Sequence, residues 1–258
     1  MGWTKVCGTA RSGIWVLKGN ARTRMLPANL DYLRVGWRKQ GSYETAWVTP
    51  GHDCLCSYAY GHGAAVRPQT NDAIWHGVIG LWGRVAPLLS PWCAKREVPT
   101  GVNLNRYFGP SSCIRWHSDN EPLFGPQNAP KLIVSMSLGN SVEFKVRRRG
   151  QGKVPSLITL DHGDLLVMDG LTQSEYVHCT ASGLQSPRVN LTFRWVAQHI
   201  ASCPLAGAVG CVLPSCVQGL AELGPRGEWS GENKWSSSWG LVLLLLILVS
   251  VLLVGTLD

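Results

Sequence analysis

The chain has 258 residues, of which 45% are hydrophobic and 16% are charged, and its formal net charge is +8. This length allows one catalytic domain with a sizeable core and shorter appended segments. No internal repeat is visible, which excludes a repeat array. The nine cysteines are an odd number and are interpreted as reduced thiols in a protein that faces the cytosol. The positive charge suits nucleic acid or an anionic membrane surface and does not distinguish them.

Residues 1–42 are predicted to form a basic N-terminal arm. The first thirty residues hold five Lys or Arg and no acidic residue, with Trp3, Ile14, Trp15 and Leu17 among them. Such a composition is found in organellar transit peptides and also in the basic arms of nucleic-acid enzymes, so the sequence leaves both open.

The next segment, residues 43–200, is predicted to be a mainly β domain with supporting helices. The best helical periodicity lies at 73–89. Short apolar runs, separated by Gly, Pro, Asn or Asp, occur at 102–107, 114–117, 132–138, 142–146, 157–160, 165–168, 176–178 and 188–196. This pattern favours a jelly-roll-like double sheet over a Rossmann alternation of strands and helices.

Three residues within this domain have the chemistry of a metal site. His117 and Asp119 are two apart, so in an extended strand they point the same way, while Ser118 faces the opposite side. With His178 they supply two imidazoles and one carboxylate, the facial set that holds non-heme Fe(II) and leaves positions open for a co-substrate and oxygen. A His-x-Asp pair alone is more often an ordinary surface pair, and the combination with later residues gives it weight.

A second constellation follows at 188–194. Four polar residues spaced by twos would share one strand face, with apolar residues on the other: Arg188, Asn190, Thr192 and Arg194 against Val189, Leu191 and Phe193. Two guanidinium groups near one iron suit a dicarboxylate such as a keto diacid. Without the histidines, a solvated strand face would be the favoured interpretation.

Taken together, these residues resemble the AlkB-like Fe(II)/2-oxoglutarate-dependent dioxygenases over roughly residues 43–196. Four stretches carry the resemblance: 105–107, 117–121, 162–178 and 188–194. The resemblance implies a double-stranded β-helix (jelly-roll, cupin-like) core with the iron at its open mouth. It also implies an enzyme that uses Fe(II), 2-oxoglutarate and O2, with His117, Asp119 and His178 as catalytic metal ligands.

The resemblance further assigns the co-substrate site. The 2-oxoglutarate would be lined by Asn105, Tyr107, Arg188, Asn190, Thr192 and Arg194, with Arg194 nearer the iron-chelating carboxylate and Arg188 nearer the distal one. The implied reaction is oxidative demethylation of an N-alkylated nucleic-acid base, in which a hydroxylated methyl group leaves as formaldehyde.

Contacts with the substrate are predicted at Asn120 and Glu121, which follow the metal carboxylate. They can accept hydrogen bonds from a flipped base, or cap a turn before Pro122, and the sequence leaves both open. Aromatic and basic residues at 37–43 and 58–61 lie where the family carries its substrate-recognition lid, although core and turn roles are equally expected.

A basic run at 145–149, with Lys153, is predicted to form a loop between two strands. This loop would bind a phosphate backbone, face anionic lipid, or be a solvated tip. Cys54 and Cys56 are interpreted as packing residues, and the spacing of Cys203, Cys211 and Cys216 matches no recognised zinc motif.

The C-terminal part is predicted to be a linker at 201–238 and a transmembrane helix at 239–257. The helix would be nineteen uncharged residues long, or about 28 Å, close to the hydrocarbon thickness of a bilayer. Because no apolar N-terminal signal is visible, we expect a single-pass tail anchor with the catalytic domain facing the cytosol. This segment keeps a second hypothesis open, a membrane-associated dioxygenase acting on a protein or lipid. A third hypothesis, a silent binding protein with the same fold, is disfavoured by the intact ligand set.

Overall fold

The computed structural model describes residues 2–50, 54–59, 65–90, 92, 98–151, 156–181 and 187–206. The strands are β1 (Thr4–Gly8), β2 (Ser12–Leu17), β3 (Arg38–Gln40), β4 (Tyr43–Val48), β5 (Pro68–Gln69), β6 (Gly101–Tyr107), β7 (Ile133–Gly139), β8 (Val142–Arg148), β9 (Ser156–Leu160), β10 (Leu165–Gly170), β11 (Tyr176–Thr180) and β12 (Arg188–Arg194). The helices are α1 (Ala21–Arg24), α2 (Asp72–Val85) and α3 (Thr172–Glu175), with 3-10 turns η1 (Asp31–Leu33), η2 (Ala86–Leu88) and η3 (Pro122–Phe124).

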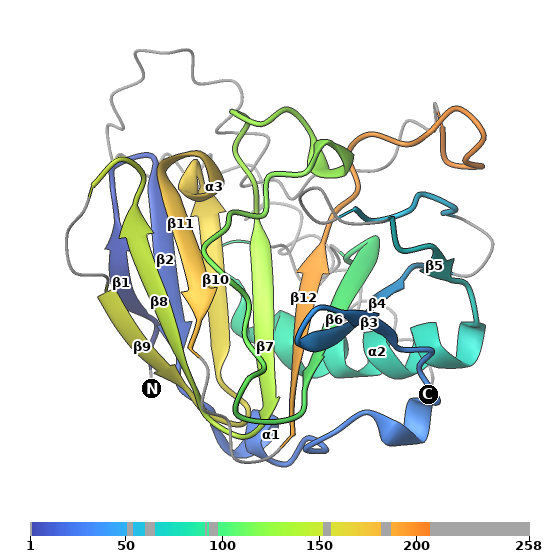
Figure 1. The fold of residues 1–258 in the computed structure, drawn as a ribbon, viewed down its shortest axis with the longest axis horizontal. Helices are drawn as coiled ribbons and strands as arrows, with labels where there is room; N and C mark the ends of the chain where they lie inside the picture. Colours follow the sequence, from blue (N-terminus) through green and yellow to red (C-terminus); the bar gives the residue numbers. More distant parts are fainter. Residues whose placement is uncertain are drawn as a thin grey trace, which may run out of the picture. The chain divides into compact units, whose positions relative to one another are not determined.

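The strands form two sheets (Figure 1). The larger has nine strands in the order β1-β2-β10-β7-β12-β6-β4-β3, with β5 beside β4, and the smaller has the order β11-β8-β9. Every pairing is antiparallel except that of β4 with β5. The predicted mainly β, two-sheet architecture with supporting helices is therefore confirmed.

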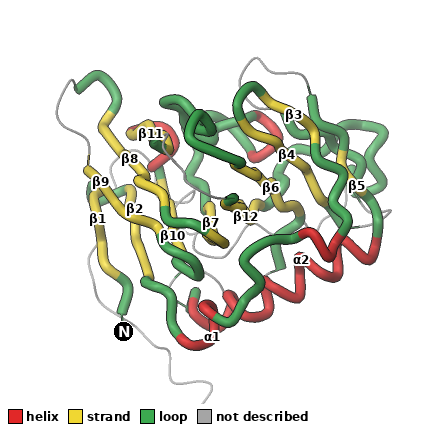
Figure 2. Tube along the Cα trace, turned by 60° about the horizontal axis from the view of Figure 1, so that its bottom comes forward, coloured by secondary structure: helices red, strands yellow, loops and turns green. Residues whose placement is uncertain are grey.

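Helix α2 covers the outer face of the larger sheet. Asn71 caps its N-terminus by accepting hydrogen bonds from the backbone N–H groups of Ala73 and Ile74. Its apolar residues recur at helical spacing and pack into the same cluster as strands β6, β7 and β12, with the rings of Trp82 and Phe193 5.0 Å apart. Figure 2 shows the helix running along this side of the sheet. The helix predicted at 73–89 is thus found as α2 followed by η2.

The alternation of side chains along β12 separates core from site. Val189, Leu191 and Phe193 are buried in the cluster beneath α2. The polar residues of the same strand point to the opposite face, toward the smaller sheet. Between the sheets lies a second apolar cluster, to which the smaller sheet contributes Val146 and Phe144. The polar face of β12 therefore borders a pocket between the two sheets, and the apolar face of the same strand packs into the core under α2.

The first 42 residues are part of the domain, and the prediction of an appended basic arm requires correction. Strand β2 pairs with β10 along its whole length, and its Ile14 is fully buried. The run from Ser12 to Leu17 combines β-branched and aromatic residues, which favour a pleated, half-buried strand. One of the basic residues, Lys18, pairs with Asp161 and Asp164, so this charge serves the fold.

The strand expected at 114–117 and the transmembrane helix expected at 239–257 have different outcomes. Residues 114–117 do not form a strand; a single bridge pairs His117 with His178. The predicted transmembrane helix and the linker beyond residue 206 lie outside the described residues. Within the described ranges, no helix is long and apolar enough to cross a bilayer.

Candidate metal centre

The three predicted metal ligands converge. The backbones of His117 and His178 bond to each other, N–H to carbonyl in both directions, at 2.9 and 2.8 Å. This pairing brings the two imidazole centroids to 4.1 Å. The Asp119 carboxylate lies between them, with Oδ1 3.4 Å from Nε2 of His117 and Oδ2 3.9 Å from Nε2 of His178. One donor atom from each residue can therefore face a single ion.

Neighbouring groups orient these ligands. The Nδ1–H of His117 donates to the carbonyl of Arg115 at 2.7 Å, which directs Nε2 toward the metal position. The backbone N–H of Asp119 donates to the buried Oε1 of Gln173 at 2.8 Å. The ring of Phe144 stacks on His178 at 5.1 Å. Sequence reasoning missed Gln173, because no pattern links a residue in α3 to a ligand 54 positions earlier.

The electrostatics of the site suit a cation. Burial, helped by the charge of His117, lowers the pKa of His178 to about 3, so this imidazole is neutral at physiological pH. Burial raises the pKa of Asp119, but the hydrogen bond with His117 and the positive charge of nearby groups, Arg194 among them, outweigh it and leave the pKa well below its usual range. A neutral imidazole and an ionised carboxylate are the protonation states in which these residues bind metal.

The predicted 2-oxoglutarate residues lie in the same place. One pocket is lined by the three metal ligands together with Asn105, Tyr107, Arg188, Asn190 and Thr192. Arg194 is at the metal end: its Nη2 donates to the backbone carbonyl of Asp119 at 3.0 Å, and its Nη1 is 3.9 Å from the carboxylate of that residue. Arg188 is at the other end, over the ring of Tyr107.

Arg188 supplies the test of whether an anionic co-substrate fits. Only 1% of the residue is exposed, and its Nη2 donates to Ser137 Oγ at 2.8 Å and to Asn190 Oδ1 at 3.2 Å. Its Nε and Nη1 have no hydrogen-bond partner among the described residues. A buried guanidinium with two unused donors is costly unless an anion occupies the position, and a carboxylate matches that fork. The site therefore fits a dicarboxylate whose far end reaches Arg188.

Asn120 and Glu121, the two residues predicted to contact substrate, differ in burial. Both Glu121 oxygens are engaged, Oε1 accepting from the Tyr58 hydroxyl at 3.0 Å and Oε2 from Arg194 Nη2 at 3.3 Å. Glu121 is only 8% exposed, and at the start of η3 its side chain makes no capping hydrogen bond. Asn120 is half-buried. Contact of either residue with a base stays a prediction.

The segment predicted as a lid contributes to the pocket in part. Gln40, Tyr43 and Tyr58 line it. Trp37 instead packs under the guanidinium of Arg106, whose Cζ is 4.5 Å from the ring centroid. Residues 60–64 lie outside the described part of the chain. Tyr58 belongs to the segment expected as a lid, and the hydrogen bond from its hydroxyl to the buried Glu121 carboxylate is a role that the sequence did not indicate.

The basic run borders the metal centre. It was expected to be a loop, but Lys145 and Arg147 belong to strand β8, since Val146 between them pairs with His178. The guanidinium of Arg147 lies 4.3 Å from the ring of Trp116, which directly precedes the first metal ligand and is 37% exposed. Beyond the strand, Arg149 bonds to the hydroxyl of Ser118. Lys153 is outside the described residues. Cationic and aromatic groups therefore lie beside the chain segment that carries the first two metal ligands.

The protein has two facing sheets, a His-x-Asp…His group between them and a buried arginine in the same pocket. These features place it in the class of iron- and keto-acid-dependent oxygenases. The chain belongs to the 2OG-Fe(II) oxygenase superfamily, whose family model matches residues 34–194, and within it the chain is AlkB-like.

Three curated relatives illustrate the similarity. Human alpha-ketoglutarate-dependent dioxygenase alkB homolog 3 is 37% identical over 178 residues, which cover 63% of this chain and 56% of that protein. The mouse protein of the same name is 37% identical over 153 residues, 50% of this chain and 52% of that protein. Arabidopsis thaliana DNA oxidative demethylase ALKBH2 is 34% identical over 117 residues, 36% of each chain. The chain thus spans about a third to just over half of the length of these relatives.

Proposed function

We propose that this protein is a 2-oxoglutarate-dependent dioxygenase that oxidatively demethylates N-alkylated nucleic-acid bases. The observation that carries the proposal is the convergence of His117, Asp119 and His178 in one pocket with the buried, half-satisfied guanidinium of Arg188. The names of the relatives, which include a DNA oxidative demethylase, support the choice of substrate.

The chemistry divides between the bound groups and the chain. Fe(II) with 2-oxoglutarate and O2, when bound, supplies hydroxylation of an N-methyl group, with succinate and CO2 as by-products and formaldehyde as the carbon that leaves. His117, Asp119 and His178 would hold the iron. Arg188 would hold the distal carboxylate, and Arg194 would hold the near one while it fixes the backbone of Asp119. The packed interior behind the pocket would exclude water from the reacting groups.

Exposed cationic and aromatic side chains on β8, beside the first metal ligand and directly after β6 support a nucleic-acid substrate. Arg147 is exposed on the strand that pairs with β11, and Trp116 beside it presents part of its ring to solvent. Phe108, at the end of β6, is 47% exposed. Aromatic faces stack on bases and guanidinium groups bind phosphates, so these residues can position a strand whose target base is flipped into the pocket.

The test is succinate release. Purified full-length protein with Fe(II) and 2-oxoglutarate is incubated with N-methylated oligonucleotides, with their unmethylated counterparts, and with membrane extracts. We expect release that depends on the methylated base and is accompanied by formaldehyde. Release with membrane extracts alone, and none above the unmethylated control with any methylated oligonucleotide, would reject the nucleic-acid substrate and leave the oxygenase chemistry intact.

The second candidate is a membrane-associated dioxygenase that acts on a protein or lipid. It is favoured by the uncharged apolar run at 239–257, which we propose spans a bilayer with the catalytic domain on the cytosolic side. Alkaline extraction of membranes from expressing cells should leave the full-length chain in the pellet, and protease added to intact organelles should degrade the catalytic domain. Release of the chain by alkali would contradict membrane insertion.

A further inference from the structure

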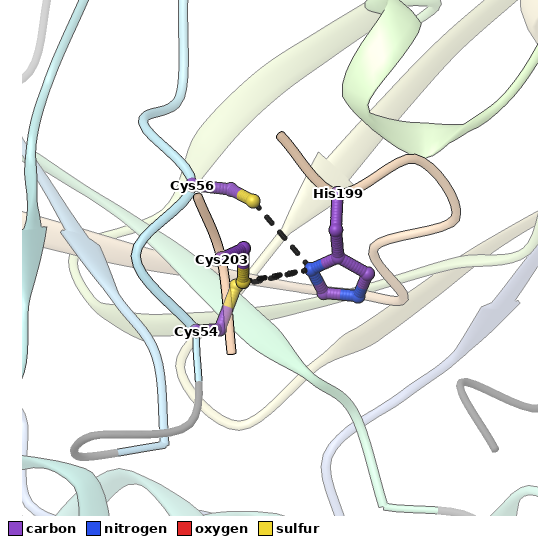
Figure 3. A group of neighbouring side chains, drawn as sticks. All are labelled: Cys54, Cys56, His199 and Cys203. Carbon is purple, nitrogen blue, oxygen red and sulfur yellow. Dashed lines mark hydrogen bonds between the residues drawn. The ribbon is translucent and has the colours of Figure 1, made fainter. Parts of the chain in front are cut away.

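A second group of potential metal ligands lies apart from the iron ligands in the chain. Cys54 and Cys56 belong to the segment after β4, whereas His199 and Cys203 belong to the segment after β12 (Figure 3). The Nδ1 atom of His199 is 3.7 Å from the sulfur of Cys54, 3.5 Å from that of Cys56 and 3.3 Å from that of Cys203. All four donor atoms lie within 4.8 Å of one another.

Packing alone does not account for this arrangement. Cys54 and Cys56 are fully buried and Cys203 is 4% exposed, in a cluster that includes Trp47 and Phe124. Burial among apolar side chains is the ordinary state of free cysteine and explains why these thiols are inside. It does not explain why three sulfurs approach one ring nitrogen, since Nδ1 has either one lone pair or one hydrogen and can satisfy one such partner.

The distances match a tetrahedral ion. With Zn–S bonds of about 2.3 Å and a Zn–N bond of about 2.0–2.1 Å, the edge between nitrogen and sulfur of a regular tetrahedron is about 3.6 Å. The three nitrogen–sulfur distances, 3.7, 3.5 and 3.3 Å, bracket that value. The nitrogen–sulfur edges therefore have the length that a tetrahedral site requires, and all four donor atoms are within 4.8 Å of one another.

The backbone around the ligands is fixed by hydrogen bonds. The carbonyl of Cys56 accepts from Trp47 Nε1 at 2.9 Å, and that of Cys54 accepts from the Thr49 hydroxyl at 2.8 Å. The N–H of Cys203 donates to the carbonyl of Ile200 at 2.9 Å. The N–H of Ile200 in turn donates to the sulfur of Cys56 at 3.4 Å, a contact that stabilises a thiolate. Such outer contacts orient ligands before the ion arrives.

We propose that Cys54, Cys56, His199 and Cys203 bind a structural zinc ion. Three thiolates and one imidazole are a soft donor set that selects Zn²⁺, whereas the two imidazoles and carboxylate of the other group suit Fe(II). Four protein ligands close the coordination sphere, so this zinc has no open position for substrate and does not take part in the reaction.

The zinc ion ties two distant segments together. The loop that carries its first two ligands continues to Tyr58, which bonds to Glu121. The segment that carries the other two continues from Arg194, which bonds to the same carboxylate. Zinc therefore holds in place the two chain segments that both bond to Glu121, two residues after the metal ligand Asp119.

The first experiment is metal analysis of the full-length protein. We expect one zinc per chain in the wild type and in Asp119→Ala, which lacks an iron ligand, and loss of zinc in Cys203→Ser. Cys7→Ser, a thiol remote from the cluster, is the matched control and should keep its zinc. A wild-type protein purified with zinc supplied but containing none, or a Cys203→Ser variant that folds and retains a full equivalent, would overturn the assignment.

Cobalt substitution tests the site without replacing any of the four proposed zinc ligands. Wild-type protein stripped of metal and loaded with Co²⁺ should show thiolate-to-cobalt charge-transfer absorption and the intense visible bands of a tetrahedral site. The same bands should appear in Asp119→Ala. Only the weak absorption of six-coordinate cobalt, or bands that vanish in Asp119→Ala, would assign the metal to the iron ligands and reject the second site.

Discussion

Arg194 and Asp119 are linked by a hydrogen bond from Nη2 of the arginine to the backbone carbonyl of the aspartate, at 3.0 Å. The same Nη2 also reaches Glu121, so one guanidinium fixes the main chain on which the metal carboxylate is mounted. The residue expected to bind the co-substrate thus also positions a metal ligand. Substitutions at this end of the pocket will consequently affect iron and 2-oxoglutarate together, whereas those at the far end will separate them.

Replacing His178 with Ala should abolish iron-dependent turnover of 2-oxoglutarate. The change removes one of the three donor groups that can face a single ion. Anaerobic titration with Fe(II) and succinate assays measure binding and turnover. His76→Ala, an exposed histidine on α2, is the control and should behave as the wild type. Turnover unchanged in His178→Ala would remove this residue from the site.

Replacing Arg188 with Ala should weaken 2-oxoglutarate binding by roughly 30-fold or more, about 2 kcal/mol, because the distal carboxylate then has no buried cation to pair with. The effect should be confined to that carboxylate. Affinity for 2-oxopentanoate, which carries a methyl group in its place, should therefore change little, and the wild-type preference for the diacid should collapse. Arg84→Ala, exposed on α2, serves as control. An equal reduction in affinity for both keto acids would place Arg188 elsewhere in the mechanism.

Replacing Tyr58 with Phe should lower the free energy of unfolding by about 2 kcal/mol, since it leaves an oxygen of the buried Glu121 without its donor. Urea unfolding of this variant beside Tyr32→Phe, an exposed tyrosine, measures the difference. Arg194 is then the one remaining described hydrogen-bond donor to the Glu121 side chain, and the same guanidinium positions the backbone of Asp119. A shift of Arg194 toward Glu121 would disturb this metal ligand, so iron affinity should also fall. A variant as stable as the wild type would show that water replaces the hydroxyl.

Reversing the charge of Arg147 should weaken binding of methylated oligonucleotides and leave 2-oxoglutarate affinity unchanged. For each phosphate that the protein no longer neutralises, the slope of log affinity against log salt should become shallower by about 0.7 to 0.9. Arg147→Glu is compared with Arg84→Glu, which makes the same change of net charge away from the pocket. If both variants lower affinity equally, the effect is due to net charge and β8 does not bind the strand.

The lowered pKa of the Lys131 side chain should make the free energy of unfolding depend on pH. Burial, followed by the charge of Arg194, lowers its pKa to about 8 from an unperturbed 10.5. Between these values the unfolded chain binds more protons than the folded one, so the free energy of unfolding rises with pH across that window. Each unit of difference corresponds to about 1.4 kcal/mol. Chemical unfolding at pH 8 and pH 10 should show the rise, and Lys131→Met should lack this contribution.

The strands that build the pocket could be predicted because their alternation is strong. Residues 188–196 were expected as a strand, and β12 spans Arg188–Arg194 with its polar residues on one face. The metal ligands could be predicted because chemistry restricts their type and spacing. Strand β2 was missed, although its apolar run is visible, since the basic residues around it suggested an arm. Its pairing with β10 is a contact between residues far apart in the sequence.

The zinc ligands illustrate what spacing cannot reveal. Cys54 and Cys56 are separated from His199 and Cys203 by more than half of the chain, and neither pair alone resembles a known zinc motif. Only the sheet, which brings the end of β4 near the end of β12 through β6, places them together.

The pairing of β2 with β10 sets a practical boundary for anyone who wishes to trim this protein. The family model covers residues 34–194, yet a fragment cut there would lose β2, one of the two strands that pair with β10, and leave the backbone N–H and C=O groups on that edge unpaired. It would also discard half of the cysteine and histidine cluster. Such a fragment would be prone to aggregate through the exposed edge of β10. A fragment intended to fold should therefore begin before β1 and extend past Cys203.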